Sequence, residues 1–258
     1  MLQASILVTS YQREHLLKWN LFSLARQHIP FSYEIIVLND GIPDGTEELC
    51  DSYRKRLPVK YVFTGQRNLP GDMKYRVPGF AVNIGAQLAG GQVLVISCAE
   101  MFHLNDTIEQ LVCPVLMDGK ILATSIGMDD QDASFLEYVE SNGGDFDYDA
   151  YLQNYPRLNT ALPFLMAINK DEFFTIGGYD EDFTGFSYDD NDLMSRLEKN
   201  GCSICLTQAQ TIHLYHPRHS EECWNTPQTI YNANLYRERS ERIIRNLGRR
   251  WGRLDKTI

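Results

Sequence analysis

Three aspartates close together are the residues in this sequence best suited to proton transfer. Asp189, Asp190 and Asp192 precede Leu193 and Leu197, whose spacing predicts an amphipathic helix that begins at the acids. Helix capping and the helix dipole explain part of this pattern, but three acids in four residues exceed what capping requires. Because neighbouring carboxylates repel one another, the pKa of at least one of them is raised, which suits a general base.

A carboxylate and a group of histidines are further candidates for chemistry. Glu100 follows the apolar residues 92–97, and a carboxylate at a strand end can bind a hard cation that bridges a diphosphate. His213, His216 and His219 recur at intervals of three, after residues that are typical of a strand end. A lone histidine is more often structural than functional, whereas three within seven residues favour a functional role.

A turn after another apolar run could contact a nucleotide. Asp40, in Asn39-Asp40-Gly41, follows the run at 33–38 and could accept hydrogen bonds from a base or a ribose. The same residue types also favour an ordinary turn, so this turn alone does not decide between the two interpretations.

The elements that would position these residues alternate between strand and helix. Strands separated by helices of 10 to 15 residues indicate an α/β fold with a mostly parallel, doubly wound sheet. Ligands of such sheets bind at the carboxyl ends of the strands, which places Thr9, Asp40 and Glu100 on one edge. Apolar runs predict strands at residues 5–9, 33–38, 59–63 and 92–97, and apolar spacing predicts helices at residues 14–28, 44–56 and 79–89.

Two later stretches have a strong charge bias. Residues 121–156 contain no Lys or Arg, and eight acids fall between positions 129 and 149, which predicts a mobile loop or insertion. It would be either a solvated acidic loop or an acceptor-side lid. Residues 237–256 hold seven Arg and one Lys against three acids, with apolar residues near one helical stripe. We expect a basic amphipathic helix there, docked on the chain's own acidic surface, an anionic membrane or an acidic partner.

Length and composition limit the class of protein. The 258 residues correspond to about one or two domains, and 43% hydrophobic with 22% charged residues is ordinary globular usage. A net charge of −10 disfavours sequence-independent binding of duplex nucleic acid. No apolar run approaches the roughly 20 residues of a membrane span, and the first residues predict no signal peptide. Six scattered cysteines fit a reducing cytoplasm, and we interpret the Cys202–Cys205 pair as part of an ordinary strand.

Four stretches, in order, resemble the family 2 glycosyltransferases of the GT-A fold. They are ILVTSYQRE, IIVLNDGIPDGT, AVNIGAQLAGGQVLVISCAEMF and GGYDEDFTGFSYDDNDLMSRLEKNG. The last is the most specific, since it follows the family pattern GG(F/Y)DE…G…ED-x-DL-x-x-RL…G. The resemblance predicts a GT-A catalytic domain at 1–220, with a nucleotide-binding half at about 1–105 and an acceptor half at 106–220, before a helical extension at 221–258.

The resemblance implies a nucleotide-sugar donor, usually a uridine or guanosine diphosphate sugar. Asn83 stands where the family has Arg-Asn-x-Gly, but Val82 replaces that arginine, and Arg76 is the nearby residue that could supply its charge. The residues expected to line the nucleotide are Thr9, Tyr11, Arg13 and Asp40, the last of them facing the base.

The resemblance also implies a divalent cation, Mn²⁺ or Mg²⁺, and a catalytic base. Cys98-Ala99-Glu100 occupies the Asp-x-Asp motif, so Glu100 is the expected metal ligand, and His213 is the expected further ligand. Asp190 matches the acid that serves as base in inverting members, and Asp189 replaces the Glu beside it. With a bound metal ion and this base, the resemblance implies that a sugar is transferred from a UDP-sugar to an acceptor hydroxyl with inversion of the anomeric configuration.

Other functions remain compatible with these residues. A retaining transferase would use the same fold, and a non-catalytic sugar- or nucleotide-binding protein would fit the altered Cys98-Ala99-Glu100 motif. A nucleotidyltransferase would need a Gly-rich phosphate loop near the N-terminus, and SYQREHLLK has no glycine. The acceptor could be a glycan, a lipid-linked sugar or a protein. We expect a cytoplasmic location, with peripheral membrane contact through the basic stretch as a further possibility.

Overall fold

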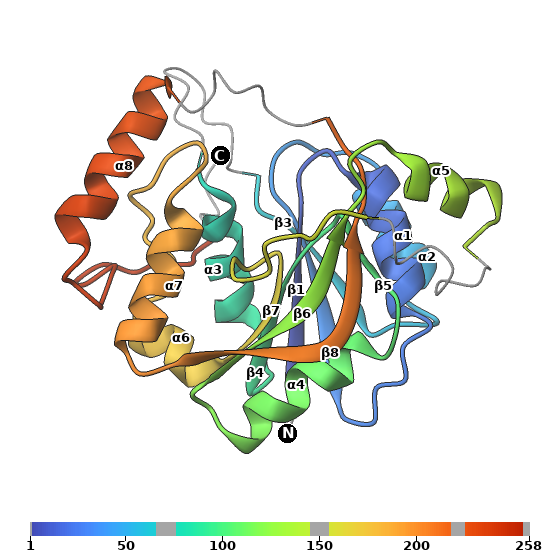
Figure 1. Ribbon diagram of the computed structural model, residues 1–258, viewed down its shortest axis with the longest axis horizontal. Coiled ribbons are helices and arrows are strands. Elements are labelled where there is room, and N and C mark those ends of the chain that lie inside the picture. The colour runs from blue at the N-terminus through green and yellow to red at the C-terminus, as the bar shows by residue number, and fades with distance from the viewer. Residues whose placement is uncertain (1, 66–75, 145–154, 218–224, 255–258) are drawn as a thin grey trace.

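The computed structural model describes residues 2–65, 76–144, 155–217 and 225–254, which are drawn in colour in Figure 1. They form one mixed sheet covered by helices. The strands are β1 (Ala4–Ser10), β2 (Tyr33–Asn39), β3 (Val59–Phe63), β4 (Val93–Cys98), β5 (Met101–His103), β6 (Ile121–Asp129), β7 (Leu165–Asn169) and β8 (Ser203–His213). The helices are α1 (Glu14–Leu24), α2 (Thr46–Tyr53), α3 (Pro78–Leu88), α4 (Thr107–Met117), α5 (Ser134–Ser141), α6 (Lys170–Thr175), α7 (Asp189–Lys199) and α8 (Pro227–Arg239).

The strand order places a reversal in the chain's progress across the sheet at β1, between its two neighbours. The order is β3-β2-β1-β4-β7-β6-β8-β5. Strands β1 to β4 pair in parallel, as the sequence predicts, and β7 then introduces antiparallel pairing with β4 and β6. The chain proceeds from β1 to β2 on one side and later returns to β4 on the other. Such a reversal leaves a ligand-binding crevice at the carboxyl ends of the two strands.

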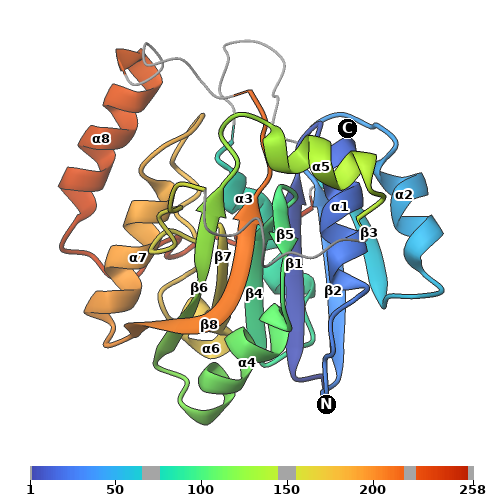
Figure 2. The ribbon, with the colours of Figure 1, turned by 45° about the vertical axis from the view of Figure 1, so that its right-hand side comes forward.

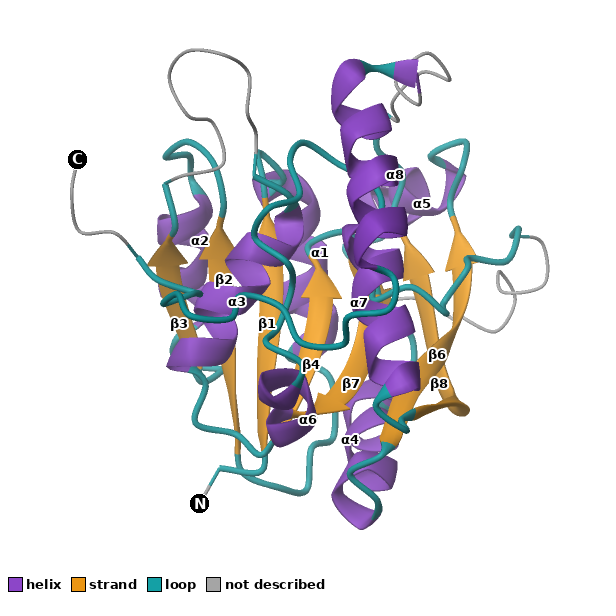
Figure 3. Cartoon of the chain, turned by 90° about the vertical axis from the view of Figure 1, so that its left-hand side faces the viewer, coloured by secondary structure: helices purple, strands orange, loops and turns teal. Residues whose placement is uncertain are grey.

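Both faces of the parallel half are buried, because successive strand residues alternate between them. Ile6 and Val8 of β1 belong to the core under α1 and α4, whereas Leu7 belongs to the core under α3. Figure 3 shows α3, α6, α7 and α8 together on one side of the sheet. This burial on two faces explains why these strands read as continuous apolar runs.

The prediction of a loop or insertion across residues 121–156 was wrong for the described part. It contains β6 and α5, while residues 145–154 lie outside the described residues. Asp130 is buried and accepts hydrogen bonds from the backbone amides of Phe135 and Leu136 at the start of α5. Phe135 and Val139 pack with residues of α1 and β5, so α5 lies beside α1 (Figure 2). Part of the acidic charge therefore serves as a helix cap, and the apolar spacing within α5 was the signal that the charge bias obscured.

The prediction of a long basic helix from Arg237 onward was wrong in extent. α8 begins at Pro227, where Thr226 accepts a hydrogen bond from the amide of Thr229, and it ends at Arg239. The described residues 240–254 form turns and irregular chain. Their arginines pair with aspartates of residues 180–192, so this stretch lies on the chain's own acidic surface, as one of the alternatives predicts.

Two further expectations concern membranes and cysteines. Of the helices in the described part of the chain, none is long and apolar enough to cross a membrane. Cys202 directly precedes β8 and Cys205 lies within it, and neither is joined by a disulfide to another described residue. The interpretation of this pair as part of a strand is confirmed.

Candidate functional site

The carboxyl ends of β1, β2 and β4 form the edge that the sequence predicts. Thr9 lies opposite Cys98 in the parallel register, and its carbonyl accepts a hydrogen bond of 3.0 Å from the amide of Ala99. The amide of Asp40 donates to the carbonyl of Ser10 at 2.8 Å. Backbone hydrogen bonds of the sheet therefore hold Thr9, Asp40 and the Cys98–Glu100 segment side by side.

Arg13 connects three segments at this edge. It lies just before α1, and its Nε donates to Oε1 of Glu100 at 2.9 Å. A second guanidinium nitrogen lies 3.2 Å from Nδ1 of His216, which follows β8. The Arg13 and Glu100 side chains are 28% and 13% exposed, so this pair can still meet a ligand. Arg13 thus places a positive charge, beside an imidazole, at the carboxyl ends of β1 and β4.

His213 lies next to Glu100 across neighbouring strands. It pairs with Met101 in the β5–β8 ladder, and the carbonyl of Glu100 accepts from the amide of Leu214 at 2.8 Å. The His213 ring is buried, with Nδ1 3.3 Å from a carboxylate oxygen of Asp129 and its ring centroid 5.1 Å from that of His216. The structure therefore brings Glu100, His213 and His216 into one neighbourhood, while His219 lies outside the described residues.

These side chains do not form a preassembled cation site. Within the described ranges, no three His, Cys, Asp or Glu side chains gather as they would around a metal ion. The Glu100 carboxylate is already paired with Arg13, and His213 faces Asp129. The donor set as arranged therefore does not fit the expected divalent ion, because a guanidinium takes the place beside the one carboxylate of the motif.

The nucleotide-side residues Tyr11 and Asp40 have different environments. Tyr11 lies against Gly41, where a Cβ would be only 2.4 Å from its ring, so this close approach requires glycine. Asp40 is buried, and its Oδ1 accepts a hydrogen bond of 2.7 Å from the Thr64 hydroxyl. Tyr11 thus presents an aromatic ring at the edge, while Asp40 contributes a carboxylate anchored from β3 by Thr64.

Arg76 and Asn83 face the second half of the chain. Arg76 pairs with Thr184 in an isolated bridge, and its guanidinium lies 3.8 Å from the Phe80 ring centroid. Asn83 is buried in α3, where its amide nitrogen donates to the Tyr179 carbonyl at 2.9 Å and its oxygen accepts from the Tyr179 amide at 2.8 Å. These contacts engage the Asn83 side chain in holding Tyr179, and its expected contact with the nucleotide remains a prediction.

The aspartate cluster begins α7, as the sequence predicts. Asp189 is buried and Asp190 is half-buried, and Oδ1 of Asp190 accepts a hydrogen bond of 2.9 Å from the Tyr179 hydroxyl. Burial raises the pKa of Asp190 to about 6, although the Tyr179 hydrogen bond opposes this rise. Ser187 and Tyr188 adopt left-handed backbone angles, with φ of 77° and 67°. Strain of this kind in residues other than glycine persists where surrounding structure enforces it, often at functional sites.

Asp192 serves a different purpose from its neighbours. Its carboxylate binds Nε of Arg196 at 2.7 Å and a guanidinium nitrogen of Arg245 at 2.5 Å, and all three side chains are buried. Arg245 also lies 3.0 Å from Oδ2 of the buried Asp180. This ion-pair group of Asp180, Asp192, Arg196 and Arg245 joins α7 to the segment after α8.

Sequence analysis did not identify Tyr179, Arg245 or Asn246 as site residues. Asn246 donates to the carbonyls of Gly177 and Tyr179 at 2.8 and 2.7 Å, next to the contacts of Arg245. A signal was available, because the acidic residues 180–182 and the basic residues 237–256 have complementary charge. That complementarity could have paired the two stretches, but the individual partners could not be assigned from it.

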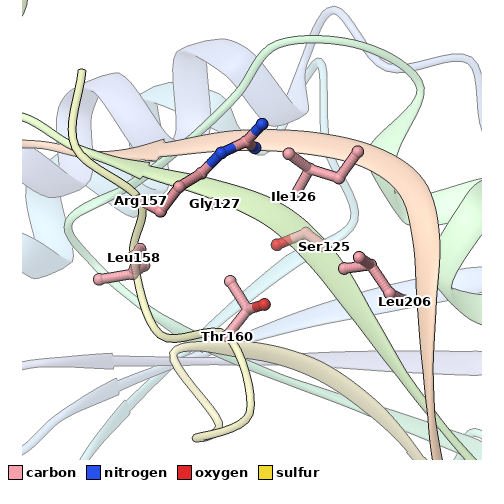
Figure 4. A pocket seen from close by; sticks show the side chains of 7 residues that line it. All are labelled: Ser125, Ile126, Gly127, Arg157, Leu158, Thr160 and Leu206. Carbon is pink, nitrogen blue, oxygen red and sulfur yellow. The ribbon is translucent and has the colours of Figure 1, made fainter.

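A separate cavity lies between β6, β8 and residues 157–160. Its volume is about 270 Å³, and Figure 4 shows its lining side chains. Its single charged side chain is Arg157, with apolar contacts from Leu158 and Leu206. None of the residues that line it belongs to the site described above.

Comparison with known sequences identifies the family. The model described as "Glycosyl transferase family 2" matches residues 5–173, and that described as "N-terminal domain of galactosyltransferase" matches residues 155–220. Validoxylamine A glucosyltransferase of Streptomyces hygroscopicus subsp. limoneus is 27% identical over 237 residues, which cover 79% of this chain and 49% of that protein. Chondroitin synthase of Escherichia coli is 24% identical over 225 residues, covering 77% and 32%. The chain thus spans about half or less of the length of these relatives.

Solved structures support the same assignment at the level of the fold. GalNAc-T7 with UDP, GalNAc and Mn²⁺ has a TM-score of 0.64 at 17% identity, covering 93% of this chain and 48% of that one. The mannosyltransferase PcManGT from Pyrobaculum calidifontis, in complex with GDP-Man and Mn²⁺, has a TM-score of 0.58 at 16% identity, covering 86% and 59%. With a family match over most of its length and this architecture, the chain belongs to glycosyl transferase family 2 and has the GT-A fold.

Proposed function

We propose that this chain is a glycosyltransferase that moves a sugar from a nucleoside diphosphate, most simply UDP, to an acceptor hydroxyl with inversion. The observation that carries the proposal is the environment of Asp190, a half-buried carboxylate with a raised pKa at the start of α7. The pKa of the Tyr179 phenol is raised by burial, by Asp190 and Asp189 at the start of α7 and by Cys98 at the end of β4. Both segments therefore approach this side chain. Membership of the family supports a nucleotide-sugar donor in this crevice.

Asp190 is the proposed base. Its ionised carboxylate accepts the proton of the acceptor hydroxyl while that oxygen forms a bond to the anomeric carbon. The bond from that carbon to the diphosphate oxygen breaks, and its electron pair leaves with the nucleoside diphosphate. A single displacement inverts the anomeric configuration. Because the pKa of Asp190 is raised to about 6, its carboxylate is a stronger base than an ordinary aspartate and is still ionised at neutral pH.

Arg13 is the proposed partner of the departing diphosphate. Its guanidinium lies at the carboxyl ends of β1 and β4, next to His216. A guanidinium can neutralise phosphate charge and donate paired hydrogen bonds to it. Thr9 and Tyr11 are proposed to line the nucleotide at the same edge, and Asp40, directly after β2, is proposed to face its base.

The participation of a divalent cation is a separate hypothesis, which the experiment below tests. The two solved neighbours contain Mn²⁺, and Glu100 is the residue that would bind such an ion here, with an imidazole from His213 or His216 nearby. Its carboxylate would first have to leave Arg13. The steps assigned to Asp190 and Arg13 do not depend on the ion.

The acceptor is proposed to be a glycan or another polyhydroxyl compound, in line with the names of the relatives. Lipid-linked sugars and proteins are the other acceptors to screen. A cytoplasmic location and peripheral membrane contact through residues 237–256 stay predictions.

The test is calorimetric titration of UDP into the protein, once with MnCl₂ and once with EDTA. Binding in either condition supports the nucleotide site, and the Glu100→Ala variant then separates two cases. If a cation acts at Glu100, the variant weakens binding only when Mn²⁺ is present. If Arg13 neutralises the diphosphate alone, wild-type binding is the same in both conditions. Failure to bind both UDP and GDP, with no transfer from either class of donor, would contradict the proposed function.

A further inference from the structure

Tyr179 is the residue outside the expected site whose contact bears most directly on the chemistry. Its hydroxyl donates to Oδ1 of Asp190 at 2.9 Å. The pKa of Tyr179 is raised well above its usual value, first by burial and then by the charge of Asp190, so the phenol keeps its proton over the working pH range. It is therefore a permanent donor to one oxygen of the proposed base.

We propose that Tyr179 is a positioning residue for Asp190, holding Oδ1 so that Oδ2 faces the acceptor hydroxyl. This inference rests on the proposed function and assigns a role to a residue that the aspartate cluster alone does not reveal. A carboxylate held through one oxygen has a defined plane, and defined geometry is what general-base catalysis requires.

The Tyr179 ring cannot easily move away from Asp190. It is 2% exposed and packs with Phe173 at 6.2 Å between ring centroids. On the α3 side it lies so close to Gly79 that a Cβ there would be 2.2 Å from a ring carbon. The ring is therefore closely packed on the sides of Gly79 and Phe173, and its hydroxyl reaches the start of α7.

The Tyr179 backbone is held by side chains from two distant parts of the chain. Asn83 bonds both its amide and its carbonyl, and Asn246 donates to the same carbonyl at 2.7 Å. Gly178 precedes it with φ of 65°, and a Cβ at Gly178 would be 2.5 Å from the Asn83 amide oxygen. The Tyr179 backbone is thus held between α3 and the segment after α8.

Few other charged or titratable groups face this pair among the described residues for which interactions are given. Asp189 adds negative charge near the phenol, and the Cys98 thiol lies close enough to affect its pKa. Asp192, two residues further along α7 than Asp190, is compensated by Arg196 and Arg245. The Tyr179 hydrogen bond is thus the specific interaction that favours the ionised form of Asp190, against the burial that disfavours it.

The decisive variant is Tyr179→Phe, which removes the donor oxygen and keeps the ring. Because the hydrogen bond stabilises the ionised carboxylate, its loss raises the pKa of Asp190 above about 6. A base works only when deprotonated, so the acidic limb of the kcat/KM profile should move to higher pH by about one pH unit. At the pH optimum, kcat should fall roughly tenfold while KM for the donor changes little. Tyr53→Phe is the matched control, since the Tyr53 hydroxyl donates to the Lys18 carbonyl on the surface.

A second measurement does not depend on activity. Carbon-13 NMR titration of the aspartate carboxyl groups should show the resonance that disappears in Asp190→Asn titrating at higher pH in Tyr179→Phe. If that variant loses its fold, 3-fluorotyrosine at position 179 supplies a stronger donor in nearly the same volume, and the titration should then move to lower pH.

The inference is overturned if Tyr179→Phe lowers stability but leaves both the acidic limb and the Asp190 titration where they were. That result would make Tyr179 a packing residue only, while the glycosyltransferase proposal would stand. Absence of transfer and of nucleotide binding in the wild type would instead remove the proposed function, and the NMR titration would still decide whether Tyr179 acts on Asp190.

Discussion

The edge at β1 and β4 and the start of α7 hold their functional side chains in contrasting ways. At the edge, the side chains lie at or just after the ends of strands, and parallel backbone hydrogen bonds fix the positions of those ends. At α7, Asp190 follows a turn with two left-handed residues, and buried side chains from α3, α8 and residues 245–252 hold that region. The first arrangement depends on the sheet, and the second depends on particular polar partners.

This difference has a consequence for mutational sensitivity. At a sheet edge, many equivalent backbone hydrogen bonds fix the position of each residue, so the loss of one side chain changes little else. In a loop held by buried polar groups, a few side-chain hydrogen bonds fix the position instead. Each buried partner left unsatisfied costs about 1–3 kcal/mol of folding free energy, and more where charge is involved. We therefore expect the largest effects on stability in the α7 region.

The largest effect is expected from Asp190→Asn. The amide cannot accept a proton from the acceptor hydroxyl, so turnover should fall by roughly 10²–10⁴ while donor binding stays nearly unchanged. Because burial raises the pKa of Asp190, its charge is unfavourable in the fold above about pH 6. The variant should therefore unfold no more readily than the wild type at neutral pH. Single-turnover kinetics and calorimetry measure the two quantities.

Asp171→Asn is the control for Asp190, since Asp171 is an exposed acid in the first turn of α6. Unchanged turnover in Asp190→Asn would remove Asp190 from the mechanism. The two regions would then differ in how their side chains are held, with no catalytic role left for the start of α7.

Arg245→Ala tests the ion-pair group. Removing the guanidinium leaves Asp180 and Asp192 with less compensation in a buried setting. The free energy of unfolding should fall by about 3–5 kcal/mol, as expected for breaking a buried pair. Arg250→Ala is the control, because Arg250 is exposed and lies in the same segment. Equal denaturation midpoints for the two variants would show that the basic stretch does not hold the α7 region.

Asn232→Ala tests the contact from α8. Asn232 is buried, donates to the carbonyls of Thr184 and Phe186 at 2.6 and 3.0 Å, and accepts from the Thr184 amide. We expect a loss of about 1–3 kcal/mol in the free energy of unfolding. Asn234→Ala, on the exposed side of the same helix, should change it by less than about 0.5 kcal/mol. A lower kcat without a change in donor KM would tie Asn232 to the loop before α7.

The smallest effect is expected in the first half, for Lys60→Met. Lys60 bonds Glu34 at 2.6 Å, but its side chain is 63% exposed. Glu34 also accepts hydrogen bonds from Ser5 and from the Gly90 amide. Glu34 itself is buried, but it keeps these two donors, and the Lys60 ammonium is largely in solvent. We therefore expect a loss of only about 1 kcal/mol in the free energy of unfolding measured with urea. A loss as large as that of Arg245→Ala would break the comparison between the two regions.

The parallel half could be predicted from sequence because its signals are local. The apolar runs at 5–9 and 92–97 each make a strand, and a strand end identifies an edge residue without knowledge of its partners. The same reasoning failed for α5, where charge bias was given more weight than apolar spacing, and for residues 240–254, where amphipathic spacing suggested a helix.

The anchoring of Asp190 could not be predicted for a different reason. Asn83 and Tyr179 are 96 residues apart, and Asn246 is a further 67 residues along the chain. No local pattern links residues at such separations. The aspartate cluster was recognisable from the sequence. Tyr179 lies in the same motif, but no local pattern there indicates that its hydroxyl binds Asp190.

The anchoring of Tyr179 by Asn246 also bears on the order of events during protein synthesis. Strands β1 to β4 can pair once the first hundred or so residues have left the ribosome, and domains generally fold from the N-terminal side at roughly 5–20 residues per second. Asn83 and Tyr179 can meet later, but Arg245 and Asn246 are translated after every strand that the structure describes. A nascent chain can therefore form the edge proposed to bind the nucleotide well before Asp190, the proposed base, is held in place. Under the proposed function, the protein should pass through a stage in which it binds its donor without being able to use it.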